Sequence, residues 1–130
     1  MCGCKIKILT ESGGASSLFQ TEGTLSREGE GERVSYLVEG DEGELLISDT
    51  SLTMCRRGKC ALQATFIEGK ETQMMIGDSS LFGNIPVRTT RYILQREDAS
   101  RDIHLRYELF KADNIQTFSL KIQLFFSEGK

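Results

Sequence analysis

Arginine and hydroxyl side chains are the residues of this chain that could most readily form a binding site. Arg56 and Arg91 fall near Tyr36, Thr89 and Tyr107 on segments that we expect to be neighbouring strands. Guanidinium groups bind carboxylates and phosphates through paired hydrogen bonds, and hydroxyls add polar contacts to a mostly apolar pocket. These five residues are our candidate ligand-binding site, and the ligand they favour is a small amphipathic or anionic molecule.

The same residues also have a purely structural interpretation. The arginines could alternate outward along their strands and form ion pairs with the acidic loops of the chain. A small barrel of about eight strands is often filled by its own side chains and then holds no ligand. Both interpretations apply to all the arginines of this group, which are Arg56, Arg88, Arg91, Arg96, Arg101 and Arg106.

Catalytic patterns are absent from the sequence. His104 is the only histidine, which excludes a histidine-based metal cluster and any mechanism that needs two histidines. Gly-x-Ser-x-Gly, Walker-type and dinucleotide-type glycine patterns do not occur, and the glycines fall at turns between strands. We therefore expect a protein that is not an enzyme and that carries no cofactor.

Four cysteines occur as two pairs, Cys2 with Cys4 and Cys55 with Cys60. They could form disulfides or a thiolate metal site, but the usual C-x-x-C spacing is missing. We interpret them as small, reduced, mostly apolar side chains that bind no metal.

The turn between Cys55 and Cys60 allows a prediction of register. A three-residue loop with a left-handed Gly58 would place Met54 opposite Cys60 and Leu52 opposite Leu62, so that apolar residues face each other. This register sends Cys55 and Cys60 to opposite faces and predicts no disulfide between them.

Strict alternation of apolar and polar side chains runs through most of the chain. Residues 56–89 read as three strands joined by glycine turns, and residues 118–126 show the clearest alternation, with Leu120, Ile122 and Leu124 on one side. The apolar row changes parity near Thr90, which predicts a β-bulge. About ten short strands and no helical pattern predict an all-β fold with little or no helix, a single closed antiparallel up-and-down β-barrel.

Length and charge narrow the possibilities further. A chain of 130 residues is large enough for one domain, residues 1–130, with its own core. The net charge of -3 and the pI of about 5.2 disfavour nucleic acid as a partner. We expect no membrane association and a cytoplasmic location, because the chain has no apolar run of about 20 residues and no apolar signal core.

An ordered set of short motifs carries a resemblance to a known family. The set comprises Gly23 on an early strand, Tyr36 on the next, Arg56-x-Gly58, Phe66-x-x-Gly69, Gly83 and Val87-x-Thr89. In this order the chain resembles the YwiB-like family of small, uncharacterised bacterial proteins from about Phe19 to Ile122. It departs from the family pattern after Gly69, where no aromatic residue follows, and in its cysteine-rich start.

The resemblance implies a calycin-like, lipocalin-type barrel and almost nothing about function. Our leading hypothesis is a binding module for a small amphipathic or anionic ligand. The alternative is an interaction protein with a filled interior that associates with itself, as a possible homodimer, or with another protein. Phe110 and Phe125, on predicted outer rows, could mark such a surface.

Overall fold

The structure, a computed structural model, describes residues 2–77 and 82–126. All regular secondary structure in these residues is β-strand, which confirms the predicted fold class. The strands are β1 (Cys2–Ser12), β2 (Ala15–Glu28), β3 (Gly31–Val38), β4 (Asp41–Ile47), β5 (Ser51–Arg57), β6 (Ala61–Ile67), β7 (Glu71–Gly77), β8 (Phe82–Glu97), β9 (Ser100–Lys111) and β10 (Asn114–Phe126).

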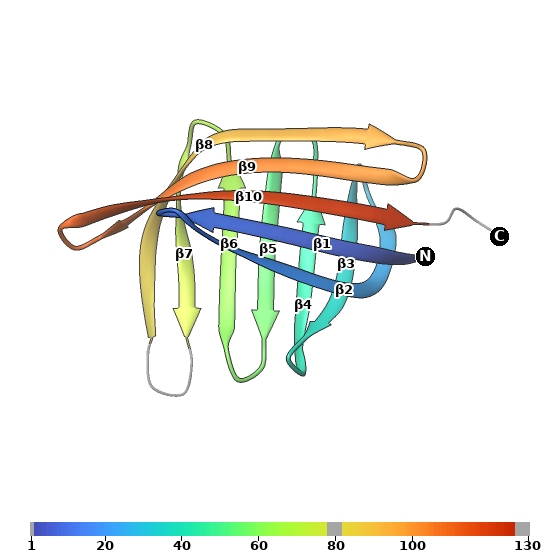
Figure 1. Ribbon diagram of the computed structural model, residues 1–130, viewed down its shortest axis with the longest axis horizontal. Helices are drawn as coiled ribbons and strands as arrows, with labels where there is room; N and C mark the ends of the chain where they lie inside the picture. The colour runs from blue at the N-terminus through green and yellow to red at the C-terminus, as the bar shows by residue number, and fades with distance from the viewer. Residues whose placement is uncertain (1, 78–81, 127–130) are drawn as a thin grey trace.

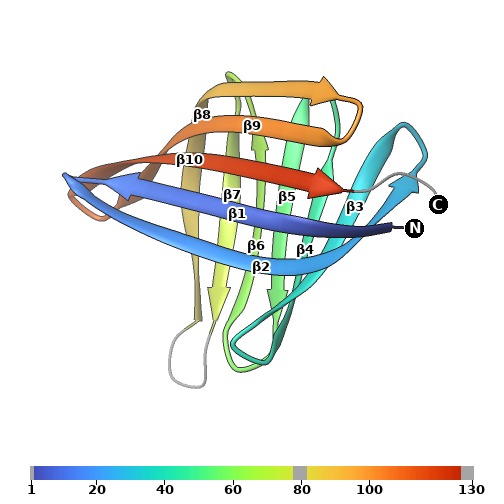
Figure 2. The same cartoon turned by 45° about the vertical axis from the view of Figure 1, so that its right-hand side comes forward.

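The strands form one closed antiparallel barrel. Each pairs with its neighbours along the chain, and β1 pairs with β10 to close the sheet, from Cys4 opposite Phe126 to Glu11 opposite Ser119. Figures 1 and 2 show two layers, in which β9, β10, β1 and β2 cross in front of β3 to β7. β8 begins in the rear layer and ends in the front one. The predicted up-and-down, calycin-like barrel is therefore the observed fold.

Side chains fill the interior of this barrel. The predicted inner row of β10 is buried, since Leu120, Ile122 and Leu124 all belong to the core. The largest fully buried side chains come from strands all round the sheet and are Phe66, Ile6, Leu45, Ile47, Leu52, Ile103, Ile122, Leu124, Val34, Val87 and Thr89. The middle of the barrel is thus a packed core, as in many small barrels.

β8 bends at a β-bulge, as the change of parity near Thr90 predicts. Thr89 lies opposite Tyr107, but the next pair is Arg91 with Arg106, so β8 carries one extra residue here. Thr90 Oγ1 donates a hydrogen bond to the Arg106 carbonyl (3.2 Å). An extra residue bends a strand and re-aims the side chains that follow it. This bend lets β8 belong to both layers.

The turn between β6 and β7 holds the bulge in place. The Gly69 backbone N–H donates to the Thr89 carbonyl (2.8 Å), and the Thr89 N–H donates to the Lys70 carbonyl (3.2 Å). Glu68 Oε1 accepts from the Tyr92 N–H (2.8 Å), beyond the extra residue. Donors that the bulge leaves outside the strand ladder are therefore satisfied by this turn.

The predicted register of the β5–β6 hairpin is wrong. Met54 lies opposite Ala64 instead of Cys60, and the other pairs of the hairpin shift equally. The shift is by an even number of residues, so the predicted inner residues still face inward. The connection, residues 58–60, has the predicted three residues but lies two residues further along the chain than the sequence predicts.

Asp41 explains the displaced connection. Its carboxylate accepts hydrogen bonds from the backbone N–H groups of Lys59 (3.0 Å) and Cys60 (3.2 Å), and from Arg56 Nε (2.9 Å). Gly58 has φ +146°, and a Cβ at this position would collide with the Asp41 carboxylate. The loop is therefore shaped around a side chain from β4, which local turn rules cannot reveal.

The cysteines follow from this register. Cys55 lies on β5 opposite Gln63, whereas Cys60 lies in the loop after the strand ends. Both are free thiols, as are Cys2 and Cys4. The structure thus contains no Cys55–Cys60 bond within the residues it describes.

A buried ion pair joins the two layers. Arg101 Nε and Nη2 donate to the two carboxylate oxygens of Glu32 (3.0 and 2.8 Å), and the two residues are 8% and 6% exposed. Arg101 Nη1 also donates to the carbonyls of Glu97 (2.7 Å) and Ser100 (2.8 Å), and the guanidinium lies 4.9 Å from the centre of the Phe126 ring. The charge of Arg101 is therefore fully paired although water is excluded.

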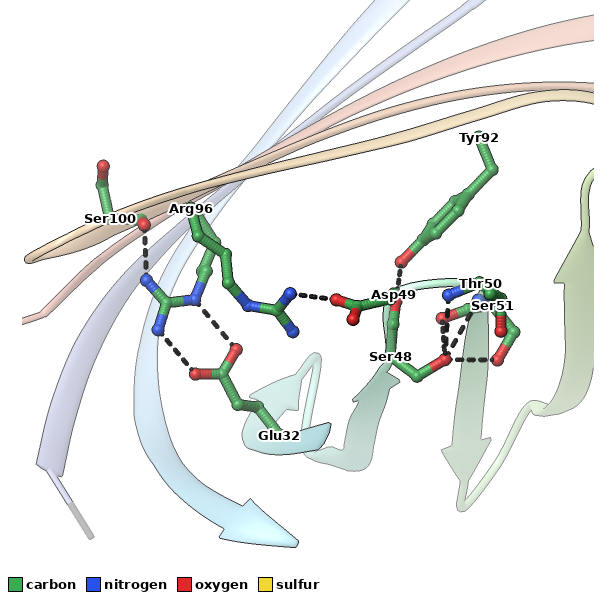
Figure 3. Close-up of polar contacts among 9 residues, drawn as sticks. Glu32, Ser48, Asp49, Thr50, Ser51, Tyr92, Arg96 and Ser100 are labelled. Atoms are coloured by element: carbon green, nitrogen blue, oxygen red, sulfur yellow. Dashed lines mark hydrogen bonds and ion pairs between the residues drawn. The ribbon is translucent and has the colours of Figure 1, made fainter. Parts of the chain in front are cut away.

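Further polar contacts close the same end of the barrel. Figure 3 shows the Arg96 guanidinium paired with the Asp49 carboxylate. It also shows the Tyr92 hydroxyl, which donates a hydrogen bond to the Ser48 carbonyl (2.7 Å). Both contacts tie β8 to the turn between β4 and β5. Together with Glu32 and Arg101 they seal this end.

We predict that Glu32→Gln lowers the free energy of unfolding by about 3–5 kcal/mol, because it leaves the Arg101 charge buried without its partner. Urea denaturation monitored by circular dichroism measures the change. The matched control is Glu42→Gln, which removes an exposed ion pair to Arg57 (3.6 Å) and should cost less than about 1 kcal/mol. Equal, small effects of both variants would show that the buried pair does not hold the layers together.

We also predict an acid dependence that originates at Asp41. Hydrogen bonds from the Lys59 and Cys60 N–H groups, and then from Arg56, lower the pKa of Asp41 below its ordinary 3.8. The stabilisation is therefore fully present above pH 3.8 and is lost as the pH falls through the lower folded pKa. Denaturation curves at neutral and at strongly acid pH should show that Asp41→Asn is less stable than wild type by a clearly larger margin at neutral pH. A difference that is the same at both pH values would contradict this origin.

Candidate functional site

Seven residues on seven strands form one row across the sheet. The row passes through the ends of β3, β4 and β5 that lie away from the Glu32–Arg101 pair. Each residue lies opposite the next, in the order Gly23, Tyr36, Gly43, Arg56, Leu62, Ile76 and Gly83. Alternation places the row on the same side of the sheet as the buried Leu52 and Met74. Ile76 is nevertheless 37% exposed. We call these seven residues the open-end row, because water reaches inward-facing side chains here.

Glycines in this row leave room for an aromatic ring. The Tyr36 ring lies over Gly43, where a Cβ would overlap the ring. The Phe19 ring, from the front layer, packs against Tyr36 with centroids 6.1 Å apart. Burial raises the pKa of the Tyr36 hydroxyl, and the charge of Arg56 offsets part of that rise. Tyr36 is thus a neutral hydroxyl donor at the open end.

Arg56 brings a fixed positive charge to the same place. Its Nε binds the Asp41 carboxylate, and this hydrogen bond raises the pKa of the guanidinium. In the described part of the chain, neither terminal nitrogen of Arg56 has a hydrogen-bond partner, and the side chain is 26% exposed. The pair with Asp41 fixes the direction of the guanidinium while two of its nitrogens stay available to an anion.

A groove of about 420 Å³ follows the ends of the strands at this row. It is lined by four short runs of consecutive residues, 55–57, 61–63, 75–77 and 83–84. The lining is mostly apolar, with Leu62, Met75 and Ile76, and Arg56 and Arg57 supply positive charge. An apolar surface with a few charged groups is typical of small-molecule sites, and this volume lies in their usual range.

The structure separates the five predicted ligand residues into three places. Tyr36 and Arg56 lie together in the open-end row. Thr89 and Tyr107 lie opposite each other inside the core, and Thr89 is fully buried. Arg91 is exposed on the outer face, because the bulge turns it away from the interior. The five residues therefore do not form one site.

Tyr107 has a packing role in this structure. The centroid of its ring lies 4.7 Å from that of the Phe66 ring. The ring also stacks on Phe118, with centroids 5.3 Å apart. Burial raises the pKa of its hydroxyl to about 12. Thr89 Oγ1 is buried without a hydrogen-bond partner among the described residues. These two residues shape the core between the two ends of the barrel.

Sequence reasoning missed several residues of the groove. Leu62, Met75 and Ile76 read as ordinary members of alternating strands, since only closure of the barrel shows that they lie at an open end. Arg57 reads as a turn residue, and Asp41 reads as one of many solvated acids. The position of Asp41 directly after Gly40, at the start of a strand, is its one local signal, and it is a weak one.

Other chemistry finds little support in the described residues. No group of three or more His, Cys, Asp or Glu side chains among them could hold a metal ion. His104 is exposed on the outer face of β9. Burial raises the pKa of the Cys4 thiol to about 11, so the reactive thiolate form of Cys4 is disfavoured. No helix long and apolar enough to cross a bilayer occurs in the part of the chain that the structure describes.

Comparisons with known proteins agree with the fold and the sequence resemblance. The profile of a family described as "Domain of unknown function (DUF1934)" matches residues 4–124. The crystal structure of the ywiB protein from Bacillus subtilis is similar, with a TM-score of 0.76 and 15% sequence identity over 96% of this chain and 90% of that chain. The comparison with curated proteins gives no match. The chain therefore belongs to the DUF1934 family, as a YwiB-like β-barrel.

Proposed function

We propose that this protein is a binding module for a small amphipathic anion, held at the open end of the barrel. The apolar part of the ligand lies in the groove along Leu62, Met75 and Ile76. Its anionic group binds the terminal nitrogens of Arg56 and the guanidinium of Arg57. The observation that carries this proposal is the contact of one mostly apolar groove with two arginines.

Because the core is packed with side chains, a binding site at the end of the barrel is better supported than one inside the barrel. Phe66 and Leu52 are among the side chains that fill the middle, whereas the groove at the open-end row has the dimensions of a small-molecule site. A role in binding is also more consistent with the site than catalysis. Arg56 and Tyr36 can both donate hydrogen bonds, but neither titrates near neutral pH, as a general base would.

Decanoate is a suitable probe, and decanol is the matched probe without the charge. We predict that decanoate shifts the backbone amide signals of Gln63, Gly77 and Asn84 in a saturable manner in ¹H–¹⁵N correlation spectra. Arg57→Gln should weaken decanoate binding roughly three- to tenfold, because an exposed ion pair contributes on the order of 1 kcal/mol. Decanol binding should remain unchanged by the same substitution.

The control is Arg27→Gln, which removes an exposed arginine near the turn between β2 and β3. This variant should bind decanoate as wild type does. A loss of affinity in both variants would indicate an effect of net charge alone. The proposal fails if decanoate leaves the three amides unmoved or shifts them without saturation.

A free strand edge favours association as a second candidate function. β2 pairs with β1 from Ala15 to Leu25 but with β3 only from Gly23 to Glu28. Residues 15–22 therefore have no strand partner on their second side among the described residues. Natural edges are commonly blocked by Pro or Lys, and this segment contains neither. Leu18, in its middle, is 56% exposed.

If this edge pairs with a second copy of the chain, the protein is a dimer at micromolar concentration, and Leu18→Lys converts it to a monomer. Size-exclusion chromatography with light scattering measures both states. Leu37→Lys changes a comparably exposed leucine on β3 and should leave the dimer intact. A wild type that stays monomeric across a wide concentration range refutes this candidate.

A further inference from the structure

Four basic side chains occupy adjoining positions on the outer face of β8, β9 and β10. Arg91 lies opposite Arg106, and His104 lies opposite Lys121 on the next outward-facing positions. All four are exposed. Residues two apart on one strand and residues directly opposite on the next share a face of the sheet. We call Arg91, His104, Arg106 and Lys121 the basic patch.

The bulge in β8 creates this patch. Thr89 faces the core, so a regular strand would turn Thr90 outward and Arg91 inward. The extra residue breaks this alternation, and Arg91 instead lies on the outer face against Arg106. The backbone thus departs from regular geometry at the position where two arginines meet.

The basic side chains of the patch form no ion pair within the described residues. Arg33, Arg56, Arg57, Arg96 and Arg101 are the arginines that form ion pairs there. Neither Arg91 nor Arg106 does, and like charges directly opposite each other on a sheet are destabilising. In a chain with a net charge of -3, such a group of basic side chains without ion pairs is unexpected from composition.

We propose that the basic patch binds a phosphoryl dianion carried by a small molecule. Arg91 and Arg106 lie where their guanidinium groups can donate to the same phosphate oxygens, a geometry that arginine suits through its paired N–H groups. Lys121 extends the positive potential, His104 adds an imidazole that can form a hydrogen bond, and Ser119, opposite Arg106, adds a hydroxyl at the edge. This site is on the outer wall, separate from the groove at the open end, and it does not depend on the proposed ligand there.

Acidic residues around the patch limit the size of its ligand. Glu108 and Asp102 stand on β9 two positions beyond Arg106 and His104, and Glu11 lies opposite Ser119 on β1. A phosphate chain such as a nucleic acid would meet these carboxylates on either side. A single phosphoryl group avoids them, and we therefore assign the site to a compact anion.

Titration with inorganic phosphate and with glycerol phosphate, at constant ionic strength maintained with chloride, tests the proposal. We expect saturable shifts of the Arg106, His104 and Ser119 amides in ¹H–¹⁵N correlation spectra. Arg106→Glu and Arg91→Gln should each weaken phosphate binding, Arg106→Glu by about tenfold or more, because hydrogen bonds to charged groups are strong. Binding of either probe supports the site, and the tighter one identifies the carrier as free phosphate or a monoester.

Thermal unfolding provides a second readout that distinguishes binding from structure. Without phosphate, Arg106→Glu should raise the melting temperature, since it replaces a repelling pair with an attractive one. Adding phosphate should raise the melting temperature of the wild type more than that of this variant, because a ligand that binds the folded state stabilises it. Phosphate also stabilises proteins generally by exclusion from their surface, and that gain is common to all variants.

Lys111→Glu is the control, with the same change of charge at an exposed position outside the patch. It should bind phosphate as wild type does. The proposal is overturned if chloride produces the same shifts as phosphate, or if Lys111→Glu and Arg106→Glu weaken binding equally. Tighter binding of a single-stranded oligonucleotide than of either phosphate probe would also overturn it, in favour of an extended polyanion.

Discussion

Closure of the sheet between β1 and β10 is the constraint on which the rest of the structure depends. Side chains of a strand alternate between its two faces, so a closed sheet encloses every second side chain. The line of paired positions that contains the open-end row continues from Gly23 through Cys4 to Phe126, each opposite the next, and there it reaches Arg101 at the closed end. The enclosed volume is then filled by the apolar side chains of the chain itself. Among the residues that the structure describes, the surfaces open to a ligand are therefore the ends of the barrel and its outer wall.

The two ends differ because their ion pairs differ. At one end the three nitrogens of the Arg101 guanidinium donate hydrogen bonds to Glu32 and to two carbonyls. The bonds to Glu32 connect β9 to β3. These strands are not neighbours in the sheet, and the pair acts as a tie across the interior. At the other end Arg56 uses one nitrogen on Asp41 and stays partly exposed. The first arrangement closes the barrel, whereas the second leaves donors at its rim.

Local pattern is sufficient to predict the strands and the bulge, because each depends on alternation along one segment. The closed barrel is predicted instead from the number of short strands and the lack of a helical pattern. Local pattern fails where a distant side chain decides the geometry. Asp41 sets the β5–β6 loop from β4, and no turn rule applied to Arg56-x-Gly58 contains that information. The candidate site is only partly predictable for a related reason. Tyr36 and Arg56 lie in the same row, but Arg91 does not join them, since a bulge whose position is known to within one residue still leaves the direction of that residue open.

The motifs that carry the family resemblance have structural explanations in this chain. Gly23, Tyr36, Arg56 and Gly83 all belong to the open-end row, where a close backbone approach at Gly23, a ring over a glycine and an ion pair shape the rim. Thr89 binds the β6–β7 turn through its backbone. The bulge that follows is needed for β8 to pass between layers, and any exposed polar residue in place of Arg91 would serve that bend equally well. An arginine placed there against Arg106 adds repulsion without helping the bend, so the requirements of the fold alone do not account for it.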